Sequence, residues 1–319
     1  MRSLILCCAL LGVVFNCWPQ TPSPALLGAG HLTPFPIPVA PGQLLTLFVQ
    51  PGGAISPSTS YSISAIYSAN GSDQAMPVLQ VAQTNTACKA PFSAPCPEIL
   101  AVTVQVPFEI QVICAWCANP VVPGGNIVLS VDGVKAPIVG VQGLQDQVHF
   151  LTICDVIVAG SSSAQPVNGG SPCTPMVTHA NGKTVSAILP AVAGEELTAY
   201  ATGLGATTPA LVTGQPDAQS SPTVTSFGLD FNYRVNALAT RPNGVGAPAS
   251  SPLFTGATKG FVGLYQVNFI IPEPPAGLPP CVDNAAIAVG GIAVLSNLTV
   301  SLGSNFSFDG AGICVTPTS

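Results

Sequence analysis

The sequence contains very few charged residues: 7 Lys and Arg and 13 Asp and Glu among 319 residues, or 6%, whereas a typical soluble domain has about 25%. So few cations cannot neutralise a phosphate backbone, which excludes nucleic acid as a partner. Aromatic residues are also scarce, at 6%, and there are 3 histidines. The 32 Gly and 33 Pro leave little room for long helix interiors. Hydrophobic residues still make up 48%, which excludes a disordered chain.

The N-terminus has the pattern of a secretory signal peptide. Arg2 precedes an apolar run over residues 4–15, and Pro-rich polar sequence follows. The run is shorter than the roughly 20 residues of a transmembrane helix. We therefore predict a signal peptide over residues 1–25, no transmembrane helix, and a secreted or cell-surface location, with the periplasm as a further option. The cleavage site stays open, and Cys17 is a candidate for lipidation.

Eight of the 11 cysteines follow the predicted signal peptide. An even number in an exported chain indicates a disulfide framework, so we predict four bridges and no free thiol. We expect one bridge between Cys281 and Cys314, at either end of the last strands, and one between Cys88 and Cys96, closing a Pro-rich loop. The predicted bridged cysteines are Cys88, Cys96, Cys114, Cys117, Cys154, Cys173, Cys281 and Cys314.

The other four cysteines leave two alternatives. Pairing nearest neighbours gives Cys114–Cys117 and Cys154–Cys173, which we favour because the second pair would flank the interdomain linker. Copying the last bridge through the internal repeat described below would instead join Cys117 to Cys154 and Cys114 to Cys173.

Three segments of the first half resemble segments of the second half in the same order. The offsets of 152, 165 and 158 residues differ by amounts that short loop insertions produce, so we expect a duplicated domain. The matching segments are 39–48 with 191–200, 102–107 with 267–272, and 127–134 with 285–292.

Between the copies, residues 159–173 are rich in Ser, Gly and Pro and read as a linker. Domain one then covers 32–158 and domain two 174–319. Short runs rich in Val, Ile, Leu and Thr, bounded by Pro, Gly or Asn, predict strands. The sequence therefore predicts an all-β protein of two tandem immunoglobulin-like β-sandwich domains. The predicted strands are 44–49, 99–106, 126–131, 148–153, 184–189, 197–202, 263–271, 285–289 and 297–302, with 43–49 equivalent to 195–201 and 99–106 to 264–271.

Domain two resembles the duplicated C-terminal domain of many secreted proteins of soil acidobacteria, a domain similar to immunoglobulin-type sandwiches of the IPT/TIG kind. The resemblance rests on 177–182, 193–197, 200–205, 261–269 and 289–300, and more weakly on 35–158. In domain one, residues 50–53 depart from the Thr-Gly-Leu-Gly turn at 202–205. The resemblance implies an exported, non-catalytic module and brings no known activity or ligand.

Candidate catalytic groups are few. His149 has Asp146 and Asp155 nearby in sequence, but the chain has no Gly-x-Ser-x-Gly nucleophile motif. Cys114 and Cys117 form a C-x-x-C, which we read as a structural disulfide rather than a redox or zinc site. The Gly-Leu-Gly at 203–205 lacks the residues of a phosphate loop. We therefore predict no catalytic, cofactor or metal site.

These expectations combine into a functional hypothesis. We expect a non-catalytic secreted or cell-surface interaction protein that acts in adhesion, matrix or envelope assembly, with an unidentified protein or glycan as its partner. The first alternative is a carbohydrate-binding module, which the scarcity of aromatic side chains disfavours. The second alternative is a secreted hydrolase.

Overall fold

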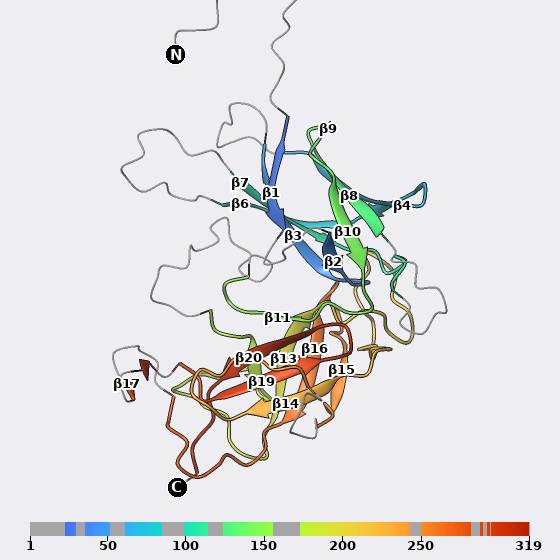
Figure 1. The fold of residues 1–319 in the computed structure, drawn as a ribbon. Coiled ribbons are helices and arrows are strands. Elements are labelled where there is room, and N and C mark those ends of the chain that lie inside the picture. The colour runs from blue at the N-terminus through green and yellow to red at the C-terminus, as the bar shows by residue number, and fades with distance from the viewer. Residues whose placement is uncertain are drawn as a thin grey trace, which may run out of the picture.

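A computed structural model describes residues 23–29, 36–51, 61–84, 99–113, 124–155, 173–242, 250–281, 288–289, 292–293 and 295–318. Within these ranges the chain forms strands and turns and no helix, so the predicted all-β class is correct. The strands build two β-sandwiches in tandem, seen as the upper and lower bodies in Figure 1. No helix in the described ranges is long and apolar enough to cross a membrane.

The first sandwich contains two sheets. One has the strand order β1-β3-β7-β6, and the other has the order β2-β10-β8-β4-β5 with β9 paired to β8. The strands are β1 (Ala25–Ala29), β2 (Ile37–Val39), β3 (Leu44–Gln50), β4 (Ile63–Ala69), β5 (Ser72–Met76), β6 (Val78–Thr84), β7 (Ile99–Gln105), β8 (Gly124–Val131), β9 (Val134–Lys135) and β10 (Val139–Gly143).

The second sandwich pairs a five-stranded sheet with a three-stranded sheet. The larger has the order β11-β13-β16-β15 with β12 beside β13, and the smaller has the order β14-β19-β20. The strands of these sheets are β11 (His149–Phe150), β12 (Val177–His179), β13 (Glu196–Thr202), β14 (Gly228–Asn232), β15 (Phe254–Ala257), β16 (Tyr265–Ile270), β19 (Leu298–Gly303) and β20 (Phe308–Ile313). Two further strands, β17 (Ala288–Val289) and β18 (Ile292–Ala293), pair only with each other in a separate two-stranded sheet.

Alternation of side chains explains why these segments form strands. In β13, Leu197, Ala199 and Ala201 are buried in the core, while Thr198 and Tyr200 between them are only partly buried. Successive side chains of a strand point to opposite faces, so every second residue reaches the core. Each sandwich has its own core cluster, built from the inward-facing residues of both its sheets.

The central strand pairs of the two sandwiches are hydrogen-bonded in equivalent registers. Leu45 lies opposite Val104 between β3 and β7, and Leu197 lies opposite Phe269 between β13 and β16. The 152-residue offset of the sequence match relates Leu45 to Leu197, and the 165-residue offset relates Val104 to Phe269. The two strand equivalences expected from the sequence therefore describe the same pairing in both sandwiches.

The turn before each of these strand pairs is also closed in the same way. The side-chain oxygen Oε1 of Gln43 accepts a hydrogen bond from Ala40 N at 2.8 Å, and Oε2 of Glu195 accepts one from Val192 N at 3.0 Å. A side chain that accepts from the backbone three residues earlier fixes the turn and the entry into the strand.

Four sequence-based expectations require correction or fall outside the described residues. The end of domain one at residue 158 is wrong, because β11 pairs with β13 and its residue Phe150 lies in the second core. The start at residue 32 also omits β1, which pairs with β3. Residues 184–189 form no strand: Thr184 makes an isolated bridge, and the chain turns back at Ser186 before Pro190. Most of the third repeat match, 285–292, lies outside the described residues.

Candidate functional site: the junction of the two sandwiches

The chain passes from the first sandwich to the second through residues 144–148, which we call the connector. Its first residue belongs to the first sandwich, because Leu144 N donates to Val39 O at 2.8 Å. Three residues later, Gln147 N donates to Gly203 O in the second sandwich at 2.7 Å. The crossing is therefore short and lies well before the predicted Ser/Gly/Pro-rich linker, of which residues 156–172 lie outside the described ranges.

The Gly-Leu-Gly segment at 203–205 lies directly against the connector. A Cβ at Gly203 would stand 2.0 Å from Gln147 O, and a Cβ at Gly205 would stand 2.0 Å from Gln145 O. Both glycines have positive φ, at 78° and 84°, which side chains disfavour. The Tyr265 hydroxyl donates to Gly205 O at 2.6 Å and holds the segment from the core side. These glycines therefore allow a close backbone approach.

On its other side the connector is held by the hairpin between β19 and β20. Asp146 is fully buried, and the hydroxyls of Ser304 and Ser307 each donate to its carboxylate at 2.6 Å. Ser307 Oγ also accepts from Val148 N at 2.8 Å. Burial raises the pKa of Asp146, while the two serine hydrogen bonds and the Arg241 charge oppose that rise. Together with the glycines, these contacts fix the connector on both sides.

Direct hydrogen bonds also join the two sandwiches beside the connector. Leu44 N, at the start of β3, donates to Thr202 Oγ1 at the end of β13 over 2.8 Å. The same hydroxyl donates to Gly263 O at 3.4 Å. Gly263 in turn lies against Leu44, whose Cδ2 would be 2.5 Å from a Cβ at position 263. Thr202 thus connects the central strands of the two domains.

A second set of bonds lies at the loop around Thr213. Its hydroxyl accepts from Phe108 N at 3.0 Å and donates to Glu109 Oε2 at 2.7 Å. The next residue, Gly214, donates its N–H to Gln105 Oε1 at 2.7 Å. Gln105 and Leu44 are paired residues of β7 and β3, so both sets of bonds meet one end of the first sandwich.

His149 lies in β11, immediately after the connector, between two carboxylates. Its Nε2 is 3.1 Å from Asp155 Oδ1, and its Nδ1 is 3.1 Å from Asp309 Oδ2 on β20. Burial alone would lower the pKa of His149, but the two hydrogen bonds and the two negative charges outweigh it and raise the pKa to about 9. At Asp155, burial alone would raise the pKa. The contacts with His149 and Thr152 outweigh it, so the pKa of Asp155 is lowered. The two carboxylates thus hold the His149 ring from both sides and favour its protonated form.

His179 is used in a similar structural way. Its Nδ1 is 2.5 Å from Glu195 Oε1, and its Nε2 is 3.2 Å from Leu189 O. It is 7% exposed and lies in β12. Glu195 is therefore occupied by His179 and by the turn at Val192. His31 lies outside the described residues, and within them no group of three or more His, Cys, Asp or Glu residues could hold a metal ion.

Two of the predicted disulfides are present. Cys281 is bonded to Cys314, and Cys154 to Cys173, the pairing that we favoured for the cysteines flanking the linker. The second bond contradicts the alternative that joins Cys117 to Cys154. Cys88, Cys96, Cys114 and Cys117 lie outside the described residues, so their two bridges stay predictions.

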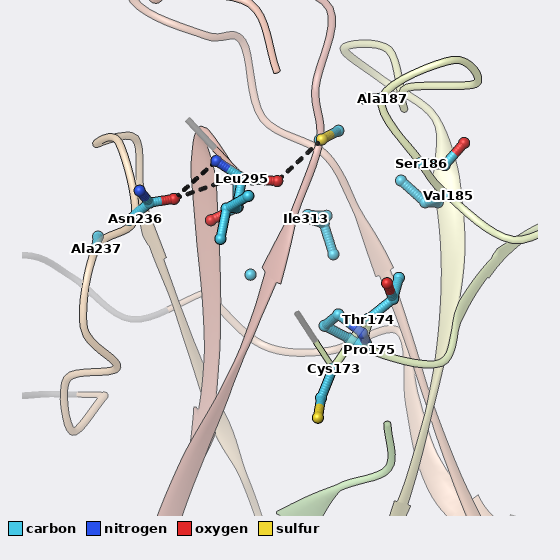
Figure 2. A pocket seen from close by; sticks show the side chains of 13 residues that line it. Cys173, Thr174, Pro175, Val185, Ser186, Ala187, Asn236, Ala237, Leu295 and Ile313 are labelled. Atoms are coloured by element: carbon cyan, nitrogen blue, oxygen red, sulfur yellow. Dashed lines mark hydrogen bonds between the residues drawn. The ribbon is translucent and has the colours of Figure 1, made fainter. Parts of the chain in front are cut away.

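Both bridges border a pocket of about 350 Å³ in the second sandwich. Figure 2 shows Val185, Ser186 and Ala187 on one side, Asn236, Ala237 and Leu295 on the other, with Ile313 between them. The described residues that line the pocket are Cys173, Thr174, Pro175, Val185, Ser186, Ala187, Asn236, Ala237, Leu295, Ser296, Gly312, Ile313 and Cys314.

The sequence did not single out most of the residues that build the junction. Ser304, Ser307 and Asp309 are separated from the connector and β11 by about 160 residues, and nothing in their spacing relates them to Asp146 or His149. Two signals were visible in the sequence: the Thr-Gly-Leu-Gly turn, which pointed to a family resemblance rather than to a contact, and the closeness of Asp146 and Asp155 to His149.

No protein-family model matches the chain, and no curated protein matches it. Among solved structures, it is aligned with the C-terminal domain of the Streptococcus agalactiae AgI/II polypeptide BspA at 11% identity. That alignment covers 92% of this chain and 99% of the other, with a TM-score of 0.15. A TM-score this low carries no argument about this protein.

Proposed function

We propose that this protein is a non-catalytic, exported interaction protein in which two β-sandwiches act as one rigid unit. It would serve in adhesion, matrix or envelope assembly. The observation that carries the proposal is the connector, which is bonded to Gly203 on one side and to Ser307 on the other. A rigid pair of domains keeps its exposed surfaces at a fixed separation, which suits a protein that links other molecules.

Export is supported by the cysteine chemistry and by the N-terminal sequence. Cys154–Cys173 and Cys281–Cys314 are disulfide-bonded, and such bonds persist in oxidising compartments. The apolar run after Arg2 supports a signal peptide. The equivalent registers of β3–β7 and β13–β16 further support the proposal that the two sandwiches arose by duplication.

A non-catalytic role is supported by how the titratable groups are used. In the described part of the chain, His149 and His179 have both ring nitrogens against oxygen atoms of neighbouring groups. The buried Asp217 accepts hydrogen bonds from Gln219 N and from Ser221, and it shapes its own loop. A base, acid or nucleophile needs a lone pair or proton directed at a substrate.

Bead adhesion tests the proposal. Beads coated with the mature protein should bind to envelopes or extracellular matrix of the source cells, and beads carrying Ser304→Ala/Ser307→Ala should bind more weakly because the connector loses its support. Ser62→Ala/Ser251→Ala removes two exposed hydroxyls elsewhere and is the matched control. Localisation of the native protein in the cytoplasm with reduced thiols, or turnover of ester, peptide or glycoside substrates, would overturn the proposal.

A further inference from the structure

The pocket of the second sandwich has walls that are fixed before any ligand arrives. Asn236 Oδ1 accepts from Leu295 N at 3.0 Å and from Ser296 N at 3.1 Å, and Asn236 N donates to Ser296 O at 3.0 Å. These three bonds hold one wall together. A preformed site loses less conformational freedom on binding than a mobile one, so a given set of contacts gives higher affinity.

Two disulfides anchor further parts of the lining. Cys173 and Cys314 both line it, and each is bonded to a cysteine elsewhere in the chain, Cys154 and Cys281 respectively. Ile313, next to Cys314, lies between the two walls in Figure 2. The pocket volume of about 350 Å³ falls in the range of about 300–1,000 Å³ that is usual for ligand sites.

The chemistry of the lining restricts the ligand. Every described residue that lines the pocket is uncharged and non-aromatic, and the polar ones contribute hydroxyl or amide groups, such as those of Thr174, Ser186 and Ser296. A charged ligand group would lose its hydration here and meet no opposite charge. A sugar ring would meet no aromatic face in the described lining. The lining therefore matches an uncharged, partly apolar ligand.

The two walls continue into exposed aliphatic side chains. Leu238, next to the lining residue Ala237, is 85% exposed, and Ile188, next to Ala187, is 84% exposed. They are the two most exposed of the large hydrophobic side chains in the described ranges. Each therefore presents apolar surface to solvent next to a residue that lines the pocket.

We propose that this pocket binds an uncharged segment of a partner protein and takes up a branched aliphatic side chain of that segment. The apolar lining would contact the side chain, and the hydroxyl and amide groups would bond to the partner backbone. Ile188 and Leu238 would contact neighbouring residues of the same segment. This inference deepens the proposed interaction function and rests on it only in naming a protein as the natural partner.

Fragment binding followed by NMR tests the pocket directly on the full mature chain. The probe is N-acetyl-leucine methylamide, and we expect saturable amide shifts at Ala187, Ala237 and Ile313 with a dissociation constant on the order of 1 mM. N-acetyl-aspartate methylamide tests the charge argument and should cause no such shifts. Methyl glucoside tests the sugar alternative and should also leave these amides unchanged.

Ala187→Trp places a large ring on one wall and should weaken binding of the leucine probe about tenfold or more. Ala180→Trp, on an exposed turn that does not line the pocket, is the matched control and should bind as the wild type does. Absence of saturable shifts with the leucine probe, equal shifts with the aspartate probe, or shifts only with the glucoside would each overturn the inference. These results are separate from the bead and localisation experiments, so failure of one proposal does not imply failure of the other.

Discussion

Gly203 lies so close to Gln147 that a Cβ at position 203 would stand 2.0 Å from the carbonyl oxygen of Gln147. The contact joins the second sandwich to the connector that leads into it. Because the clashing atom would be a backbone oxygen, a side chain at 203 can be accommodated only if the connector moves. The packing of the two domains therefore depends on the absence of a side chain at this position.

Replacing Gly203 with Ala should destabilise the protein by about 2–5 kcal/mol, because the left-handed backbone costs about 1–2 kcal/mol and overpacking about 1–3 kcal/mol. Gly182→Ala is the matched control, since Gly182 has the same φ of 78° but open space around it. It should lose only about 1–2 kcal/mol. Urea unfolding of both variants gives the comparison, and equal losses would contradict the close approach at Gly203.

His149 should make stability depend on pH in the alkaline range. Its pKa rises from 6.5 to about 9 on folding, so its contribution is fully present below pH 6.5 and is lost as the pH rises through about 9. The full contribution is on the order of 3 kcal/mol. His149→Asn should remove this dependence, as measured by urea unfolding between pH 6 and 10. Parallel profiles for the two proteins would show that the carboxylates do not hold an imidazolium.

Asp155 should make stability depend on pH in the acid range, with the opposite sign to the effect of His149. Its pKa is lowered from 3.8 in the folded protein, where the His149 and Thr152 contacts outweigh burial. Its contribution is therefore present above pH 3.8 and is lost as the pH falls below that value. Asp155→Asn should flatten the acid limb of the stability profile, and an unchanged acid limb would contradict the assignment.

Thr202→Val should weaken the contact between the sandwiches. The substitution leaves Leu44 N without its acceptor, and an unsatisfied buried donor costs about 1–3 kcal/mol. Hydrogen exchange should report faster exchange of the Leu44 amide. Thr198→Val, the same change in the same strand but at a partly exposed position, is the control and should leave that amide protected. Unchanged exchange at Leu44 in Thr202→Val would count against the bond.

The disulfides permit a chemical test. A non-reducing peptide map should show Cys154 joined to Cys173 and Cys281 to Cys314, with Cys88–Cys96 and Cys114–Cys117 as the two predicted bridges. Alkylation without reductant should label none of these cysteines. The double substitution Cys281→Ser/Cys314→Ser should cost about 2–4 kcal/mol. A peptide joining Cys114 or Cys117 to another partner would refute the nearest-neighbour scheme for that pair.

The sequence by itself determined where several of the strands lie and which strands of the two sandwiches are equivalent. The run at 44–49 and its counterpart at 197–202 have the composition and alternation that a pleated, half-buried strand requires. These preferences are local, so they can be read without knowledge of distant residues. The offsets between matching segments related β3 to β13 and β7 to β16, but only the structure showed that β3 pairs with β7 and β13 with β16 in equivalent registers.

Only the tertiary structure decided where one domain ends and the next begins. The Ser/Gly/Pro-rich segment at 159–173 has the composition of a linker, yet the chain crosses at 144–148. That crossing is set by Ser304 and Ser307, which bond to Asp146 across about 160 residues. The pocket depends in the same way on contacts between distant segments, such as that of Asn236 with Leu295. Hydrogen bonds between residues so far apart leave no periodicity or spacing in the sequence, because their geometry exists only after both sandwiches have folded.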